Sequence, residues 1–285
     1  MDFYRPTSLA EALSLLAQQE GARCLAGGAT LVAMMNAGLV EPSGLISLAD
    51  LRDLFGITSL PDGSVRVGAT TRHVDTAQST IFRAGQCVLP AAAEKIANPP
   101  VRNMGTIGGS LAFADPAADY LPALASLDAV VEVASRDGIR TLPIGDLVID
   151  WYTTVLGVED IITGVIIPRA PGGSIGVFEK LERTAGDFAI ASVALVLAIE
   201  GGVCSAARIA IGGCAAKPVR LSEAEALIEG TRLDDAVLVK AGRMLVEACD
   251  PVDDVRASAD YRRLVVPRLL VKTIARARVA LGAGS

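Results

Sequence analysis

The sequence is poor in residues that bind metals. Its only histidine is His73, and its five cysteines include no Cys-x-x-Cys pair. Iron–sulfur clusters need four closely spaced thiolates, and zinc sites need similar groupings of cysteine and histidine. We therefore predict no metal ligands on this chain, a surface or capping role for His73, and reduced, mostly buried thiols. Redox chemistry on this chain would need a bound organic cofactor.

Long apolar runs, a basic excess and a secretory leader are also missing. Although 51% of the residues are apolar, no uninterrupted apolar run reaches the ~18 residues that a membrane helix needs. The opening stretch, MDFYRPTSLAEAL, has no basic region followed by an apolar core, so we expect no secretory signal. The net charge of −6 argues against nucleic acid as a partner. These features predict a cytoplasmic protein, free or held at the inner face of the membrane through a partner.

The common nucleotide-binding fingerprints are absent, since the sequence contains neither G-x-G-x-x-G nor G-K-[ST]. Two short glycine loops are present instead, AGGAT at Ala26–Thr30 and GTIGGS at Gly105–Ser110. Glycines permit positive φ and close approach of a ligand, and successive N–H groups in such loops can converge on an anion. One loop of this kind is more often a tight turn. Two of them favour a diphosphate site.

The length and the linker signals predict two domains. A chain of 285 residues can bury two cores, and its strongest linker signal is RAPGG at Arg169–Gly173. We predict domains at 1–172 and 173–285, the first divided into about 1–55 and 56–172. We expect Pro267 to kink the last helix unless the helix restarts there. Strands are predicted at 22–26, 44–48, 64–67, 129–134, 139–143, 159–168, 192–200 and 204–211, and helices at 9–21, 31–35, 89–97, 120–127, 222–229, 234–249 and 258–281.

Four segments together resemble one family. They are AGGAT at 26–30, VRNMGTIGGSLAFADPAAD at 101–119, FEK with DFA at 178–189, and DDVRASADYRR at 253–263. In this order they resemble the FAD-binding (medium) subunit of the molybdenum hydroxylases, of the carbon monoxide dehydrogenase and xanthine dehydrogenase type. The resemblance implies an α+β fold. A two-part FAD-binding domain of the vanillyl-alcohol-oxidase (PCMH) type would be followed by a smaller C-terminal domain with an antiparallel sheet and helices.

Carried over residue by residue, the resemblance implies a FAD site and no catalytic residue. The two loops would hold the diphosphate, and Asp119 would lie near the ribityl and adenosine end. Lys180 would lie beside the flavin, where a cation favours a reduced, anionic ring, and Ile96 and Ile162 would contact the flavin or the adenine. The implied loop residues are Ala26, Gly27, Gly28, Ala29, Thr30, Leu31, Thr106, Ile107, Gly108, Gly109 and Ser110.

Other interpretations of these residues stay open on the sequence alone. Asp119 is also a fitting helix N-cap, the two isoleucines are also ordinary core residues, and Lys180 is also a fitting surface lysine. Two positions depart from the family, because relatives often have a hydroxyl or histidine at Ala29 and a tyrosine at Phe178. Any contact made by those side chains is lost here.

The function implied by the resemblance is electron relay. A large molybdenum-cofactor subunit would oxidise the substrate, and a small subunit with [2Fe–2S] clusters would pass the electrons to FAD on this chain. NAD or another acceptor would then take the pair, in a dimer of heterotrimers. The alternatives are a self-sufficient FAD-dependent reductase or oxidase of the same fold and a non-enzymatic adenine-nucleotide-binding module. We find no acid–base constellation of the kind that a self-sufficient enzyme needs.

Overall fold

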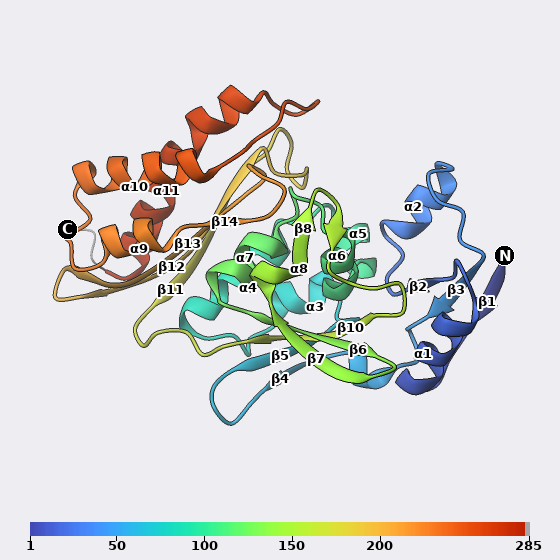
Figure 1. Ribbon diagram of the computed structural model, residues 1–285. Coiled ribbons are helices and arrows are strands. Elements are labelled where there is room, and N and C mark those ends of the chain that lie inside the picture. The colour runs from blue at the N-terminus through green and yellow to red at the C-terminus, as the bar shows by residue number, and fades with distance from the viewer. Residues whose placement is uncertain (283–285) are drawn as a thin grey trace.

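A computed structural model describes residues 1–282, and Figure 1 shows the N-terminal part at one end and the C-terminal helices at the other. The N-terminal part is a three-stranded parallel sheet in the order β1-β3-β2. Its elements are β1 (Asp2–Tyr4), α1 (Leu9–Gln18), β2 (Arg23–Leu25), α2 (Leu31–Asn36) and β3 (Gly44–Ser47). Ser8 caps α1 by accepting the N–H of Glu11, as the capping motif predicts.

The middle part is a five-stranded antiparallel sheet covered by short helices. Its strands, in sheet order, are β4 (Ile57–Ser59), β5 (Val65–Gly68), β10 (Ile161–Ile167), β6 (Val130–Ser135) and β7 (Gly138–Pro143). The helices are α3 (His73–Gln78), α4 (Val88–Glu94), α5 (Pro99–Met104), α6 (Ile107–Phe113), α7 (Tyr120–Ser126) and α8 (Ile144–Leu147), with 3-10 turns at Arg52–Leu54 and Ala84–Cys87. A small hairpin joins β8 (Val148–Asp150) to β9 (Thr153–Thr154).

The C-terminal part is a four-stranded antiparallel sheet with three helices. Its strands are β11 (Ile175–Leu181), β12 (Ala191–Glu200), β13 (Val203–Gly212) and β14 (Val219–Arg220), and its helices are α9 (Ser222–Ile228), α10 (Asp235–Ala248) and α11 (Ala259–Ala280). Gly201 and Gly202 both have positive φ, so they form the turn that joins β12 to β13. Pro267 lies inside α11, which runs through it without interruption.

The C-terminal sheet is covered on both faces. One face packs against α4 and α7, so that Phe178, Ala194 and Val196 belong to the core of the middle part. The other face packs against α10 and α11 and forms a separate core. Alternate residues of one strand point to opposite faces, so β11 and β12 place side chains in both cores. The predicted α+β fold, ending in an antiparallel sheet with helices, is confirmed.

The structure corrects two local predictions between residues 89 and 110. The helix expected at 89–97 ends at Glu94, because Ala97 adopts a left-handed φ of 44° and Arg102 donates to the carbonyl groups of Ile96 and Ala97. The loop expected at Gly105–Ser110 is instead the beginning of α6, and Thr106 caps that helix through the N–H of Gly109.

Candidate functional site

The two glycine loops lie against each other. A Cβ at Gly27 would lie 1.7 Å from the carbonyl oxygen of Met104 and 3.0 Å from the Cα of Gly105. No residue with a side chain fits there without displacing the backbone of the second loop. Loops that are about eighty residues apart in the sequence therefore form one wall.

The first loop offers free backbone donors. None of the N–H groups from Gly27 to Leu31 donates a hydrogen bond to another residue within 1–282. Gly28 has a φ of +75°, and the Thr30 hydroxyl makes no capping bond to α2. Consecutive unpaired N–H groups at a residue with positive φ form a concave site for an anion. Residues 26–31 are therefore suited to hold phosphate oxygens.

Most backbone N–H groups of the second loop already donate hydrogen bonds within the protein. The N–H groups of Ile107 and Gly108 donate to the carbonyl oxygens of Thr71 (3.0 Å) and Ala69 (2.8 Å). A Cβ at Gly108 would lie 2.7 Å from the Cβ of Ala69, and Ile107 is fully buried. The expectation that successive N–H groups of GTIGGS converge on an anion therefore does not hold for Ile107 and Gly108. Gly109 is exposed and Ser110 is half-buried, although the N–H groups of both donate to Thr106.

His73 packs against the second loop and hydrogen-bonds to it. Its backbone N–H donates to the carbonyl oxygen of Gly105 (3.0 Å), and its Nδ1 lies 3.2 Å from the hydroxyl of buried Tyr120. A Cβ at Gly105 would lie 2.5 Å from Nε2 of His73. Burial, with the nearby Arg102, lowers the pKa of His73 to about 4, so the imidazole is neutral. The predicted surface position is wrong; His73 begins α3 and is buried.

Asp119 and Lys180 form a buried ion pair. Lys180 Nζ lies 2.9 Å from Asp119 Oδ2, and its side chain has no exposed surface. The surface alternative for Lys180 is therefore wrong. Asp119 stands at the N-cap position of α7, but its side chain makes no capping bond. Burial raises the pKa of Asp119 to about 7, and Lys180 opposes this shift. Asp119 Oδ1 is buried with no hydrogen-bond partner within 1–282.

The two predicted isoleucines pack in the core of the middle part. Ile162 is buried in β10, paired with Val133 of β6, and Ile96 is half-buried two residues beyond the end of α4. Their packing agrees with the core interpretation, and their contact with a cofactor stays a prediction. Lys180 Nζ also donates a hydrogen bond to the backbone carbonyl oxygen of Asp187 (2.9 Å).

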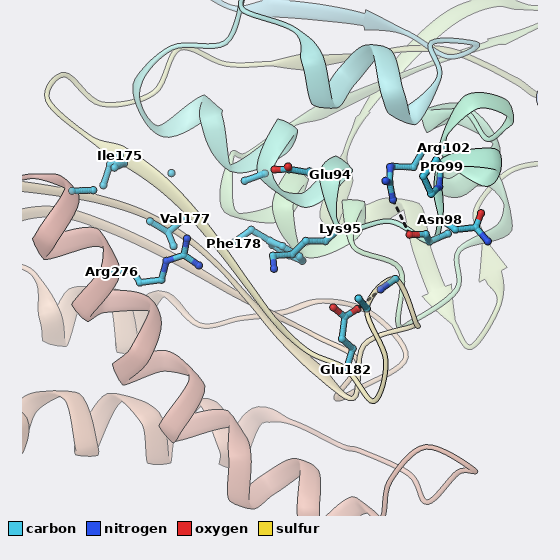
Figure 2. A pocket seen from close by; sticks show the side chains of 16 residues that line it. Glu94, Lys95, Asn98, Pro99, Arg102, Ile175, Val177, Phe178, Glu182 and Arg276 are labelled. Atoms are coloured by element: carbon cyan, nitrogen blue, oxygen red, sulfur yellow. Dashed lines mark hydrogen bonds between the residues drawn. The ribbon is translucent and has the colours of Figure 1, made fainter.

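A separate cleft of about 720 Å³ lies between α4–α5 on one side and β11 with α11 on the other (Figure 2). Glu94, Lys95, Arg102, Glu182 and Arg276 supply its charged lining. None of the residues predicted to hold the cofactor lines it. The candidate site is therefore defined by the free donors of the first loop and the free acceptor of Asp119, and not by this cleft.

These residues fit a flavin nucleotide. The unpaired N–H groups of residues 27–31 suit a diphosphate, and the orphaned Oδ1 of Asp119 suits a hydroxyl or imide N–H donor. No group of three or more potential metal ligands occurs in the part of the chain that the structure describes. No helix within residues 1–282 is long and apolar enough to cross a membrane.

Comparison with known proteins places the chain in a family. Residues 1–170 match the FAD binding domain in molybdopterin dehydrogenase, and residues 176–277 match the CO dehydrogenase flavoprotein C-terminal domain. The chain is 34% identical to the 6-hydroxypseudooxynicotine dehydrogenase complex subunit alpha of Paenarthrobacter nicotinovorans, over 97% of this chain and 94% of that protein. It is also 34% identical to the carbon monoxide dehydrogenase medium chain of Afipia carboxidovorans, over 97% and 96% of the two chains.

A solved structure agrees with this relationship. The crystal structure of cyanide-inactivated Cu,Mo-CO dehydrogenase contains a chain that superposes with a TM-score of 0.93 at 35% identity, with 98% of both chains covered. The family models, the similar sequences and the superposed structure each cover nearly the whole chain. The chain belongs to the FAD-binding medium subunits of the molybdenum hydroxylases.

Proposed function

We propose that this chain carries FAD and relays electrons within a molybdenum-dependent hydroxylase or dehydrogenase. A small partner subunit with [2Fe–2S] clusters supplies the electrons, and NAD or another acceptor receives them. A large partner subunit binds the molybdenum cofactor and oxidises the substrate. The names of the relatives support this assembly, since one is a subunit of a dehydrogenase complex and another is a medium chain. The complex is a cytoplasmic dimer of heterotrimers.

One observation carries the proposal. Within residues 1–282, five consecutive N–H groups, at residues 27–31, have no hydrogen-bond partner, and the buried Oδ1 of Asp119 also has none. Residues 26–31, Gly109 and Ser110 hold the diphosphate, and Asp119 accepts a hydrogen bond from the ligand. Ile107, Gly108 and Thr106 shape this wall through their backbone. FAD, when bound, supplies the two-electron redox chemistry.

The chain's own residues bind and orient the cofactor and transfer no protons to an organic substrate. His73 is buried beside the hydroxyl of Tyr120, and Asp119 Oδ2 is held by Lys180, so both side chains already have partners within the protein. This arrangement argues against a self-sufficient oxidase, which needs such a group beside the flavin.

Two measurements test the proposal. We expect the purified chain to release FAD, and not FMN, on denaturation, and to show no oxidation of an alcohol, amine or heterocycle. Co-expression with the two partner subunits should yield a complex whose substrate reduces the flavin. A folded chain without flavin contradicts FAD binding. Efficient substrate oxidation by the isolated chain contradicts the relay role and supports a self-sufficient enzyme.

A further inference from the structure

Two of the five cysteines meet in the core of the C-terminal part. Cys214 lies two residues beyond the end of β13, and Cys249 caps the C-terminal end of α10. Both belong to the core between the sheet and the helices, as free thiols with 1% and 9% of their surface exposed. Their side chains hydrogen-bond to each other, although they are about thirty-five residues apart in the sequence. The fold therefore builds a thiol pair that no Cys-x-x-Cys motif indicates.

An arginine of α11 lies near each sulfur. The charge of Arg262 favours the thiolate form of Cys214, and the charge of Arg263 favours that of Cys249. Arg262 already donates to two backbone carbonyl oxygens (2.6 Å each) and to Asp254 (2.7 Å). Its Nε is buried and has no hydrogen-bond partner within 1–282. Cations beside a cysteine are typical of reactive thiols, because they stabilise the thiolate.

The two sulfurs differ in character. Their shared hydrogen bond lowers the pKa of the Cys249 thiol and raises that of Cys214, because the protonated sulfur donates to the ionised one. Cys249 is also the more exposed of the two. The thiolate, and not the thiol, is the nucleophile in cysteine chemistry. Cys249 is therefore suited to react first with an oxidant, and Cys214 is suited to supply the second sulfur.

We infer that Cys214 and Cys249 form a redox-active dithiol, which hydrogen peroxide converts into a disulfide. The Cys249 thiolate attacks one peroxide oxygen, the O–O bond breaks, and the leaving hydroxide takes up the proton that Cys249 had lost. This gives a sulfenic acid on Cys249 and one water. The Cys214 sulfur then attacks Cys249 Sγ, so that an S–S bond forms, the S–O bond breaks and the Cys214 proton leaves with the hydroxide as water. Two thiols are oxidised, and one peroxide is reduced to two waters.

The disulfide would tie the end of β13 to the end of α10. Gly213, next to Cys214, donates its N–H to the carbonyl oxygen of Pro116 in the FAD-binding part (3.0 Å), and its own carbonyl oxygen accepts from Arg262 (2.6 Å). The cross-link therefore fixes a loop through which the C-terminal core contacts the 115–119 segment. Only the source of the peroxide rests on the proposed function, since a flavin that passes its electrons to dioxygen releases this oxidant.

Mass spectrometry of the full-length chain, reduced and then treated with hydrogen peroxide, tests the inference. Trypsin separates the relevant cysteines, because Cys214 lies in peptide 209–220, Cys249 in 244–256 and Cys204 in 184–208. We expect 209–220 to become linked to 244–256, and dithiothreitol to release them. The link should form at least about tenfold faster than Cys24 and Cys87 are oxidised, although these are more exposed, because burial raises the pKa of both thiols.

Thermal unfolding gives a second readout on the same samples. The disulfide restricts the unfolded chain, so the peroxide-treated protein should melt roughly 5–10 °C higher than the reduced protein. Cys204→Ser is the matched control, since it removes another buried thiol of the same core and should leave the link unchanged. Cys214→Ser should leave a sulfenic acid on Cys249, which dimedone traps.

Three outcomes overturn the inference. They are faster oxidation of Cys24 or Cys87 than of the pair, a link that forms only in the urea-unfolded chain, and oxygen atoms added to Cys249 without any link to Cys214. The wild-type measurement depends on no variant, so it stays decisive if Cys214→Ser does not fold. It also requires no bound cofactor. A chain that forms the link but binds no FAD contradicts the proposed function and leaves this inference in place.

Discussion

Gly27→Ala should separate the two glycine loops. The added methyl group would lie 1.7 Å from the Met104 carbonyl oxygen, where ordinary contact begins near 3.4 Å, so the loops must move apart by about 1.7 Å. The Met104 oxygen belongs to the backbone, and the backbone also fixes the position of a Cβ, so no change of rotamer relieves the clash. Overpacking of this kind costs about 1–3 kcal/mol. The free protein can relieve part of the cost by opening, but a ligand held by both loops forces them together again.

The cost should therefore appear in FAD binding as well as in stability. Since about 1.4 kcal/mol is worth a factor of ten, we expect the dissociation constant for FAD to rise about ten- to a hundredfold. The melting temperature of the apo chain should fall by roughly 2–4 °C for each kcal/mol that remains unrelieved. Titration of apo protein with FAD, followed by flavin fluorescence, measures the first, and circular dichroism measures the second.

Gly145→Ala is the control for this experiment. Nothing lies within 4 Å of a Cβ at Gly145, and that residue sits in α8, where alanine is favoured. Its FAD affinity should equal that of the wild type. A Gly27→Ala chain with wild-type affinity and stability would refute the reasoning, because it would show that the loops need not touch for the ligand to bind.

Two further predictions concern the neighbouring residues. Gly108→Asp should lower the melting temperature and the soluble yield, because its Cβ would lie 2.7 Å from the Cβ of Ala69. Gly109→Asp should give a folded protein with little FAD, because its Cβ approaches only Thr106 Oγ1, at 3.0 Å, and its charge repels phosphate. Equal melting temperatures of the two variants would contradict this. The second prediction concerns His73, whose pKa is lowered from 6.5 to about 4. Its neutral form therefore adds about 3 kcal/mol to the free energy of unfolding above pH 6.5, and this stability is lost as the pH falls toward 4. Urea unfolding at pH 7.5 and pH 5 should show a smaller loss of stability in His73→Gln than in the wild type, and parallel losses would exclude the assignment.

The sequence predicts well those features that local chemistry determines. The Gly201–Gly202 turn, the Ser8 cap and the helix at 222–229 all depend on residues within one or two turns of each other, and the structure contains them. The two glycine loops could also be found, because their composition is unusual and the family motif marks their order.

Features that depend on distant partners could not be found in this way. Nothing near His73 in the sequence indicates that Tyr120 and Gly105 will enclose it. Likewise, Thr71 and Ala69 capture the N–H groups of the second loop from a strand end more than thirty residues earlier. A glycine-rich segment shows where backbone can approach a ligand, but only the fold decides which N–H groups are still free.

The unpaired groups of the candidate site and the cation beside them come from different parts of the chain. The free donors belong to residues 27–31, and the free acceptor is Asp119, so both lie within the 1–170 segment that matches the FAD binding domain. The cation that holds Asp119 lies within the 176–277 segment. Burial raises the pKa of Asp119, and the charge of Lys180 opposes that rise, so the second segment supplies the cation that favours the ionised carboxylate. The packing of the C-terminal sheet against α4 and α7 therefore brings this cation to Asp119, although that sheet contributes no loop to the candidate site.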